Sequence, residues 1–125
     1  MWWVVDGNNV MGAGADGWWN DPVAAATRLA QAVAEWASTH DDPVTLVFDG
    51  RPEPTVADRG GGNLTVDFAR RPGRDAADDR IVELVDADPD PETITVVTSD
   101  GELADRVQAH GAKVYGSRSF RRELV

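Results

Sequence analysis

The 125-residue sequence contains no cysteine and only two histidines. Without cysteine, neither a disulfide framework nor a thiolate zinc site can form. His40 and His110 alone do not supply an imidazole-rich metal site. Any metal ion bound by this chain must therefore be held by oxygen ligands.

Long hydrophobic runs are also missing. No apolar stretch approaches the roughly 20 residues that a membrane-spanning helix needs. Residues 1–5 are too short for a secretory signal peptide and lack its basic flank. We therefore expect a cytoplasmic protein with no membrane partner.

Basic residues are few, with 12 Lys and Arg against 22 Asp and Glu, so the net charge is −10. Non-specific affinity for nucleic acids comes chiefly from Lys and Arg neutralising phosphates, so the surface as a whole does not attract RNA or DNA. The charges are unevenly placed, however. Acidic residues crowd positions 86–92, whereas Arg118, Arg121 and Arg122 crowd the C-terminal region. Local basic patches therefore remain compatible with the acidic total.

The remaining composition is that of a globular domain. Apolar residues make up 42% of the chain and charged residues 27%, which is typical of a soluble protein with a packed core. A length of 125 residues fits one domain, which we place over residues 1–125.

Strands and helices are predicted to alternate along the chain. Short apolar runs predict strands at residues 2–5, 44–48, 64–68, 94–98 and 112–115. Apolar residues at helical spacing predict helices at 22–38, 74–85 and 102–110, and residues 51–62 are predicted to form a mobile loop that could lie over a site. This alternation predicts a Rossmann-like α/β fold, in which helices cover both faces of a mostly parallel sheet of about five strands.

Acidic residues directly follow three of the predicted strands, at Asp6, Asp49 and Asp100. The carboxyl ends of parallel strands share one edge of a sheet, where ligands of such folds bind. Each residue alone is also explained as a turn residue, and Asp100 as a helix cap. Together, closely held like charges are unfavourable unless a cation neutralises them or protons are taken up. The three positions therefore indicate a cation site.

The second predicted helix adds Asp75, Asp78 and Asp79, which share one helical face. One explanation is stabilisation of the helix N-terminus, by about 0.3 to 1 kcal/mol per residue. The other is a Mg²⁺ or Mn²⁺ site formed by carboxylates and water. One or two such ions can activate a water molecule and stabilise the leaving oxygen in phosphodiester hydrolysis.

For this site we predict Asp6, Asp78 and Asp100 as direct or water-mediated ligands. Asp75 is a further ligand or orients a water molecule. Asn9 helps to fix Asp6 or a substrate phosphate. Asp79 is the alternative to Asp78, because the sequence does not determine the rotation of the helix to one residue.

Arginine and tryptophan residues are the candidates for substrate contacts. Arg70, Arg71 and Arg74 could bind phosphates bidentately or pair with nearby carboxylates. Arg118, with the other C-terminal arginines, could follow an RNA backbone, dock on a larger particle such as the ribosome, or belong to a solvated tail. Trp18 and Trp19 could stack on bases or belong to a loop folded back on the helices.

Five motifs in order resemble the YacP-like branch of the NYN domains, which belong to the PIN-like nucleases. The family's opening D-G-x-N-V resembles residues 4–10 (VVDGNNV), although Asn8 stands where relatives often have an aromatic residue. Its V-F-D resembles residues 46–49 (LVFD), and its A-D-E-R-I resembles residues 77–81 (ADDRI), with Asp75 where relatives often have Glu. Its V-T-S-D matches residues 96–100 (VVTSD), and its closing S-x-R-E-L region resembles residues 116–124.

This resemblance implies a PIN-like fold and a metal-dependent endoribonuclease that uses Mg²⁺ or Mn²⁺ and acts on RNA. It implies that Asp6, Asp78 and Asp100 are the central acids and Asp75 the fourth. Asp49 and Ser99 fall within the motifs as supporting residues. PIN-like folds also include members that only bind RNA, so the alternative is an inactive RNA- or ribosome-binding module. No preference for DNA follows from the sequence.

Two unrelated classes also place acids at strand ends. A receiver-type domain with Asp49 as phosphoacceptor needs a lysine after a later strand, but Lys113 lies inside the last predicted strand. A haloacid-dehalogenase-like phosphatase needs D-x-D after the first strand, where this chain has Asp6-Gly7-Asn8. Both classes therefore fit less well than the nuclease.

Overall fold

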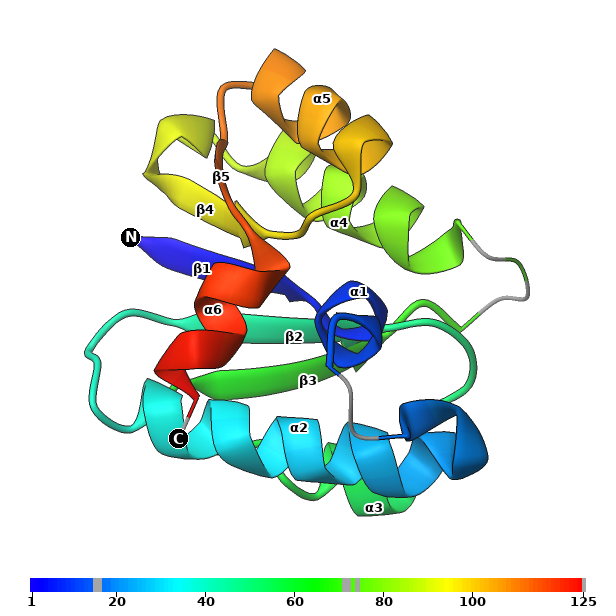
Figure 1. Cartoon of the computed structure of the whole chain (residues 1–125). Helices are drawn as coiled ribbons and strands as arrows, with labels where there is room; N and C mark the ends of the chain where they lie inside the picture. Colours follow the sequence, from blue (N-terminus) through cyan, green and yellow to red (C-terminus); the bar gives the residue numbers. More distant parts are fainter. Residues whose placement is uncertain (15–16, 71–72, 74, 125) are drawn as a thin grey trace.

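The computed structural model describes residues 1–14, 17–70, 73 and 75–124, and within them the chain forms one five-stranded parallel sheet (Figure 1). The order across the sheet is β3-β2-β1-β4-β5, and every neighbouring pair is parallel. The strands are β1 (Trp2–Asp6), β2 (Val44–Phe48), β3 (Leu64–Phe68), β4 (Ile94–Val97) and β5 (Lys113–Tyr115). The predicted α/β fold with a parallel sheet is confirmed.

Helices cover both faces of this sheet, which makes three layers. The longest is α2 (Pro22–Ala37), and the two on the opposite face are α4 (Ala76–Ala87) and α5 (Gly101–Ala109) (Figure 1). The shorter helical elements are α1 (Gly7–Gly12), η1 (Trp18–Asn20), α3 (Pro54–Ala57), η2 (Pro91–Thr93) and α6 (Ser117–Glu123).

The sheet has a hydrophobic core on each face, and successive residues of a strand point alternately into one core and the other. Val5 packs toward α1, α2 and α6, whereas Val4 packs toward α4 and α5, and both are fully buried. Strands buried on both faces read as continuous apolar runs, because no side chain of the strand points to solvent. This is why the sequence predicted the inner strands β1, β2 and β4 well.

Three segments differ from the sequence predictions. Residues 7–12 were given no helix from the sequence but form α1. The helix starts in close contact with β2, which only a glycine at position 7 permits. A Cβ atom there would lie 2.8 Å from the Val47 carbonyl oxygen and 2.7 Å from Phe48 Cε1, too close for any larger residue. The expected mobile loop at 51–62 contains α3, whose Val56 is 1% exposed. The C-terminal arginines belong to α6 rather than to a tail, because Phe120 is fully buried against Trp36.

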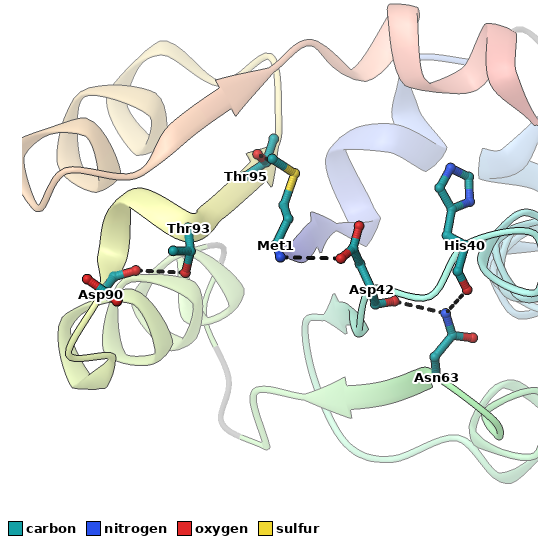
Figure 2. Close-up of polar contacts among 7 residues, drawn as sticks. All are labelled: Met1, His40, Asp42, Asn63, Asp90, Thr93 and Thr95. Carbon is teal, nitrogen blue, oxygen red and sulfur yellow. Dashed lines mark hydrogen bonds and ion pairs between the residues drawn. The ribbon is translucent and has the colours of Figure 1, made fainter.

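The amino-terminal edge of the sheet is held by Asn63 (Figure 2). Its Nδ2 donates hydrogen bonds to the carbonyl oxygens of Ala37, His40 and Asp42, at 2.8, 3.0 and 2.8 Å. Its own carbonyl accepts from the Val44 amide at 2.8 Å. One side chain therefore joins the end of α2, the turn after it and the start of β3.

Replacing Asn63 by Ala should lower the free energy of unfolding by about 1 to 3 kcal/mol, because several partly buried carbonyls lose their donor. Urea denaturation measures this. Asn20→Ala changes an exposed asparagine and should stay within about 0.5 kcal/mol of the unsubstituted chain. Equal effects of the two substitutions would contradict the role of Asn63.

None of the helices within the described residues combines the length and the apolar character that a membrane span requires.

Candidate active site

A cavity of about 420 Å³ opens at the carboxyl-terminal edge of the sheet. It lies next to β1, the point at which the strand order reverses: β2 and β3 follow on one side of β1, and β4 and β5 on the other. Parallel α/β sheets typically bind their ligands at such a point. Within the described residues, five carboxylates contribute to it, from β1, the end of β2, the start of α4 and the start of α5. The lining residues are Asp6, Asn8, Asn9, Asp49, Asp75, Ala77, Asp78 and Asp100.

Asp6 is the deepest of these carboxylates, with 3% of its surface exposed. Burial, together with the negative charge of Asp78, raises its pKa from 3.8 to about 7. A hydrogen bond from Thr98 Oγ1 to Asp6 Oδ2, at 2.9 Å, opposes this shift. Without a cation, Asp6 is therefore only partly ionised at neutral pH.

Asp78 also has a perturbed carboxyl group. Burial raises its pKa to about 6, and the charges of Asp100, Asp75 and Asp49 add to the shift, whereas Arg106 opposes it. Like charges thus converge on this side chain, which is the electrostatic signature of a site that gains from bound positive charge.

Asp79 points away from the cavity, toward α5. Its Oδ1 lies 3.0 Å from a guanidinium nitrogen of Arg106. Neighbouring residues on a helix are rotated by about 100°, so only one of Asp78 and Asp79 can face the site. The packing of Ala77, Ile81 and Val85 into the core determines that it is Asp78.

Asp49 connects the end of β2 to α4. Its Oδ1 accepts a hydrogen bond from the Ala77 amide at 2.8 Å, while its own amide donates to Asn8 Oδ1 at 2.8 Å. Asp75 occupies the N-cap position of α4, but its side chain makes no capping bond. The start of α4 is therefore capped by Asp49, the residue after β2, rather than by Asp75. This contact places Asp78 at the cavity, and the Asp75 carboxylate lines the cavity without capping the helix. Burial raises the pKa of Asp49, and the Ala77 amide opposes this.

Asp100 caps α5 and lines the cavity at the same time. Its Oδ1 accepts from the amides of Glu102 and Leu103, at 2.9 and 3.2 Å. Within the part of the chain that the structure describes, Oδ2 has no hydrogen-bond partner. The two explanations of Asp100 from sequence, helix cap and site residue, are therefore compatible.

Asn9 and Ser99 form a polar connection behind the cavity. Asn9 Oδ1 accepts from the Ser99 amide at 2.8 Å and from the Ser117 hydroxyl. Ser99 Oγ accepts from the Ser117 amide at 2.9 Å. These bonds join α1, the loop that carries Asp100, and the start of α6. The Asn9 side chain therefore holds these loops in place, while the backbone amide of Asn9 donates a hydrogen bond to Asp6.

Thr98 was given no role from the sequence. Its hydroxyl donates to Asp6 and accepts from the Asp100 amide at 3.1 Å, and it is 1% exposed. It thus connects two acids that are 94 positions apart in the chain. A threonine at a strand end indicates a functional role only when the residues that it contacts in the folded chain are known. Arg106, beside Asp78 and Asp79, was missed for the same reason.

The two predicted substrate arginines that the structure describes, Arg70 and Arg118, are not part of the cavity wall. Arg70 is exposed two residues after β3, has a left-handed φ of 65°, and donates its amide to the Gly50 carbonyl at 2.9 Å. Arg118 is exposed on α6. Arg71 and Arg74 lie outside the described residues. Trp18 packs partly against the core, whereas Trp19 is 62% exposed.

On the sequence prediction that Asp6 is a metal ligand, Thr98→Val should weaken binding of Mg²⁺ or Mn²⁺ by about 10- to 100-fold, the usual cost of removing a group that orients such a ligand. It should also raise the pKa of Asp6 further, because the Thr98 hydrogen bond lowers it. Metal titration and carboxyl-carbon NMR titration of Asp6 in the metal-free protein measure the two effects. Thr98→Ser keeps the hydroxyl and should restore both; a valine variant with unchanged metal affinity and an unchanged pKa of Asp6 would exclude this positioning role.

The parallel α/β sheet and the acidic cavity at its carboxyl edge define a Rossmann-like domain with a polar site at the strand ends. The family model described as the YacP-like NYN domain matches residues 3–125, and the chain belongs to this family. The family resemblance predicted from the motifs is confirmed, and with it a nuclease-like, RNA-related fold.

Two solved structures are similar over nearly the whole chain. The crystal structure of Rae1 (YacP) from Bacillus subtilis is 27% identical with a TM-score of 0.79, and the match covers 99% of this chain and 73% of that one. The W164L mutant of the same protein is 29% identical with a TM-score of 0.77, covering 98% and 74%. No curated protein sequence matched the chain.

Proposed function

We propose that this chain is a metal-dependent endoribonuclease that hydrolyses RNA phosphodiester bonds with Mg²⁺ or Mn²⁺. The observation that carries the proposal is the cavity in which Asp6, Asp49, Asp75, Asp78 and Asp100 meet. The nuclease-like fold of the family and the similarity to Rae1 support it. An acidic cavity repels RNA phosphates by itself, so the proposal requires a bound cation that neutralises the carboxylates.

The donor set fits a hard divalent cation. The cavity offers carboxylate and amide oxygens, which Mg²⁺ and Mn²⁺ prefer. Within the described residues, no three acidic or histidine side chains are gathered closely enough to hold an ion entirely by themselves. Mg²⁺ sites typically use one or two carboxylates and several waters, which a cavity of about 420 Å³ can accommodate.

The proposed roles follow from the contacts. Asp6, Asp78 and Asp100 would hold the ion, directly or through water, and Asp75 would hold it or orient the attacking water. Asp49, Asn9, Ser99 and Thr98 position these groups. A bound divalent cation would lower the pKa of a coordinated water and stabilise the charge on the leaving oxygen.

The RNA backbone needs cationic partners outside the cavity, since the net charge is −10. Arg70 extends from the same edge of the sheet, close to Gly50. Arg118 follows Ser117, which is bonded to the loop carrying Asp100. We propose that these two, with Arg71 and Arg74, contact phosphates, and that α6 is the surface for a larger RNA-containing partner such as the ribosome.

Purified protein incubated with RNA should cleave it with Mg²⁺ or Mn²⁺ and lose that activity with EDTA. Asp6→Asn and Asp100→Asn should lose cleavage while still binding RNA. If the unsubstituted chain is inert with both metals but binds RNA or ribosomes, the function is that of an inactive RNA-binding module. Circular dichroism of the variants establishes that they are folded.

A further inference from the structure

A second cavity of about 210 Å³ lies beside the acidic one. Asn8 and Asp49 line both cavities, and the hydrogen bond from the Asp49 amide to Asn8 Oδ1 joins them into a common wall. The second cavity extends from this wall toward α3 and the first turn of α2. A ligand in one cavity therefore lies directly next to a ligand in the other.

The inner surface of this second cavity is apolar. Phe48 and Phe68, stacked at 6.0 Å between ring centroids, lie at the ends of β2 and β3, and Met11, Ala26 and Val56 complete the wall. Pockets for drug-sized ligands measure roughly 300 to 1,000 Å³, so this one accommodates a single planar ring system.

The rim of the cavity carries polar groups of both kinds. Arg51 is an exposed planar donor, Glu53 is an acceptor, and Asn8 contributes a side-chain amide whose Oδ1 is already engaged. An apolar floor with a donor and acceptor rim matches a nucleobase, which offers two flat faces and a hydrogen-bonding edge.

One exposed apolar side chain lies at this cavity. In the described part of the chain, the large hydrophobic residues that are exposed are Met1, Trp19 and Val23. Of these, Val23 lines the cavity, in the first turn of α2. The cavity wall therefore includes apolar surface that a ligand can reach from solvent.

We propose that this cavity binds one unstacked base of the RNA substrate, next to the phosphate that lies at the acidic cavity. The inference rests on the proposed RNA-cleaving function. It adds a specificity subsite: the acidic cavity acts on the backbone common to all nucleotides, whereas the neighbouring cavity reads one base. Cleavage then depends on an unpaired nucleotide at that position, because a base held in a duplex cannot enter.

The first test needs no catalysis. Amide signals of the cavity residues are followed by NMR during titration with AMP, GMP, CMP and UMP in EDTA, with ribose 5-phosphate as the baseless control. At least one nucleotide should give saturable shifts at millimolar concentration that ribose 5-phosphate does not give. If none does, the proposal is wrong.

A pair of variants tests the location. Val23→Glu adds a charge at the cavity, in the first turn of α2, where an acidic residue is compatible with the helix. It should weaken nucleotide binding by about tenfold or more, the scale of one base–protein stacking contact. Gln31→Glu adds the same charge to the same helix away from this cavity and should leave binding unchanged. Equal weakening by both would overturn the assignment.

The second test uses cleavage of an RNA with single abasic substitutions. One position flanking the cut should lower kcat/KM by about tenfold in the unsubstituted chain, and by much less in Val23→Glu. If the protein binds nucleotides but does not cleave RNA, the proposed function is wrong and the base site stands. If it cleaves RNA, shows the same kcat/KM at every abasic position and binds no nucleotide, only the base site is wrong. Shifts with N-acetyl-leucine amide but with no nucleotide would identify a protein-docking pocket and overturn the proposal.

Discussion

Asp78→Asn should reduce the rate of metal-dependent RNA cleavage by about 10²- to 10³-fold, comparable to removing one essential electrostatic contact from an active site. Asp78 lines the acidic cavity, and the charges of Asp100, Asp75 and Asp49 act on its carboxyl group. Asparagine keeps the size of the side chain but removes the charge that would hold a cation. Single-turnover cleavage across a range of Mn²⁺ concentrations measures the loss.

Asp79→Asn is the matched control, because it makes the same change one residue away on the same helix. Its carboxylate faces Arg106 rather than the cavity. Loss of this half-exposed ion pair should cost about 1 kcal/mol of stability or less and leave cleavage within about threefold. If Asp79→Asn is the inactive variant and Asp78→Asn is active, the assignment of these two residues is reversed.

The metal-free protein should lose stability as the pH rises from about 4 to about 7. The pKa of Asp6 is raised from 3.8 to about 7 in the folded chain, so between these values the folded state binds more protons than the unfolded state. Stability from this group is therefore complete below pH 3.8 and lost as the pH passes about 7. Three pH units correspond to about 4 kcal/mol, and Asp78 adds a smaller, solvent-screened contribution of the same sign.

Urea denaturation in EDTA at several pH values measures this dependence. Asp6→Asn should be the more stable protein at pH 8 and should show a flatter pH profile. Mg²⁺ or Mn²⁺ should stabilise the unsubstituted chain at pH 8 more than the Asp6→Asn variant, because only the former offers the full carboxylate set. A stability that rises with pH over this interval, or that is the same in both proteins, would contradict the electrostatics of the site.

The sequence predicted the sheet well and the short helices poorly. Strands β2 and β4 are buried along their whole length and β1 over its last three residues, so their apolar runs are visible without any neighbour. The edge strands β3 and β5 expose Thr65 and Lys113, and their shorter apolar runs were still sufficient to predict them. Helices α1 and α3 have six and four residues, too few for a hydrophobic period to show. They form because tertiary contacts stabilise them: Gly7 of α1 lies against β2, and Val56 of α3 is buried in the core.

The sequence by itself determined the fold class, the family and the set of acidic residues at one edge of the sheet. These follow from local patterns, since apolar runs, turns and short motifs are properties of neighbouring residues. The catalytic and metal-binding roles of those acids remain predictions for the experiments above.

Only the tertiary structure decided which acids face the cavity and what holds them. The rotation of α4 depends on the packing of Ile81 and on a cap from Asp49, 28 residues away from Ala77. Thr98 joins Asp6 to Asp100, and Asn8 joins the two cavities, through contacts between distant parts of the chain. No local pattern carries these relations, because they arise only when parallel strands bring their carboxyl ends to the same edge.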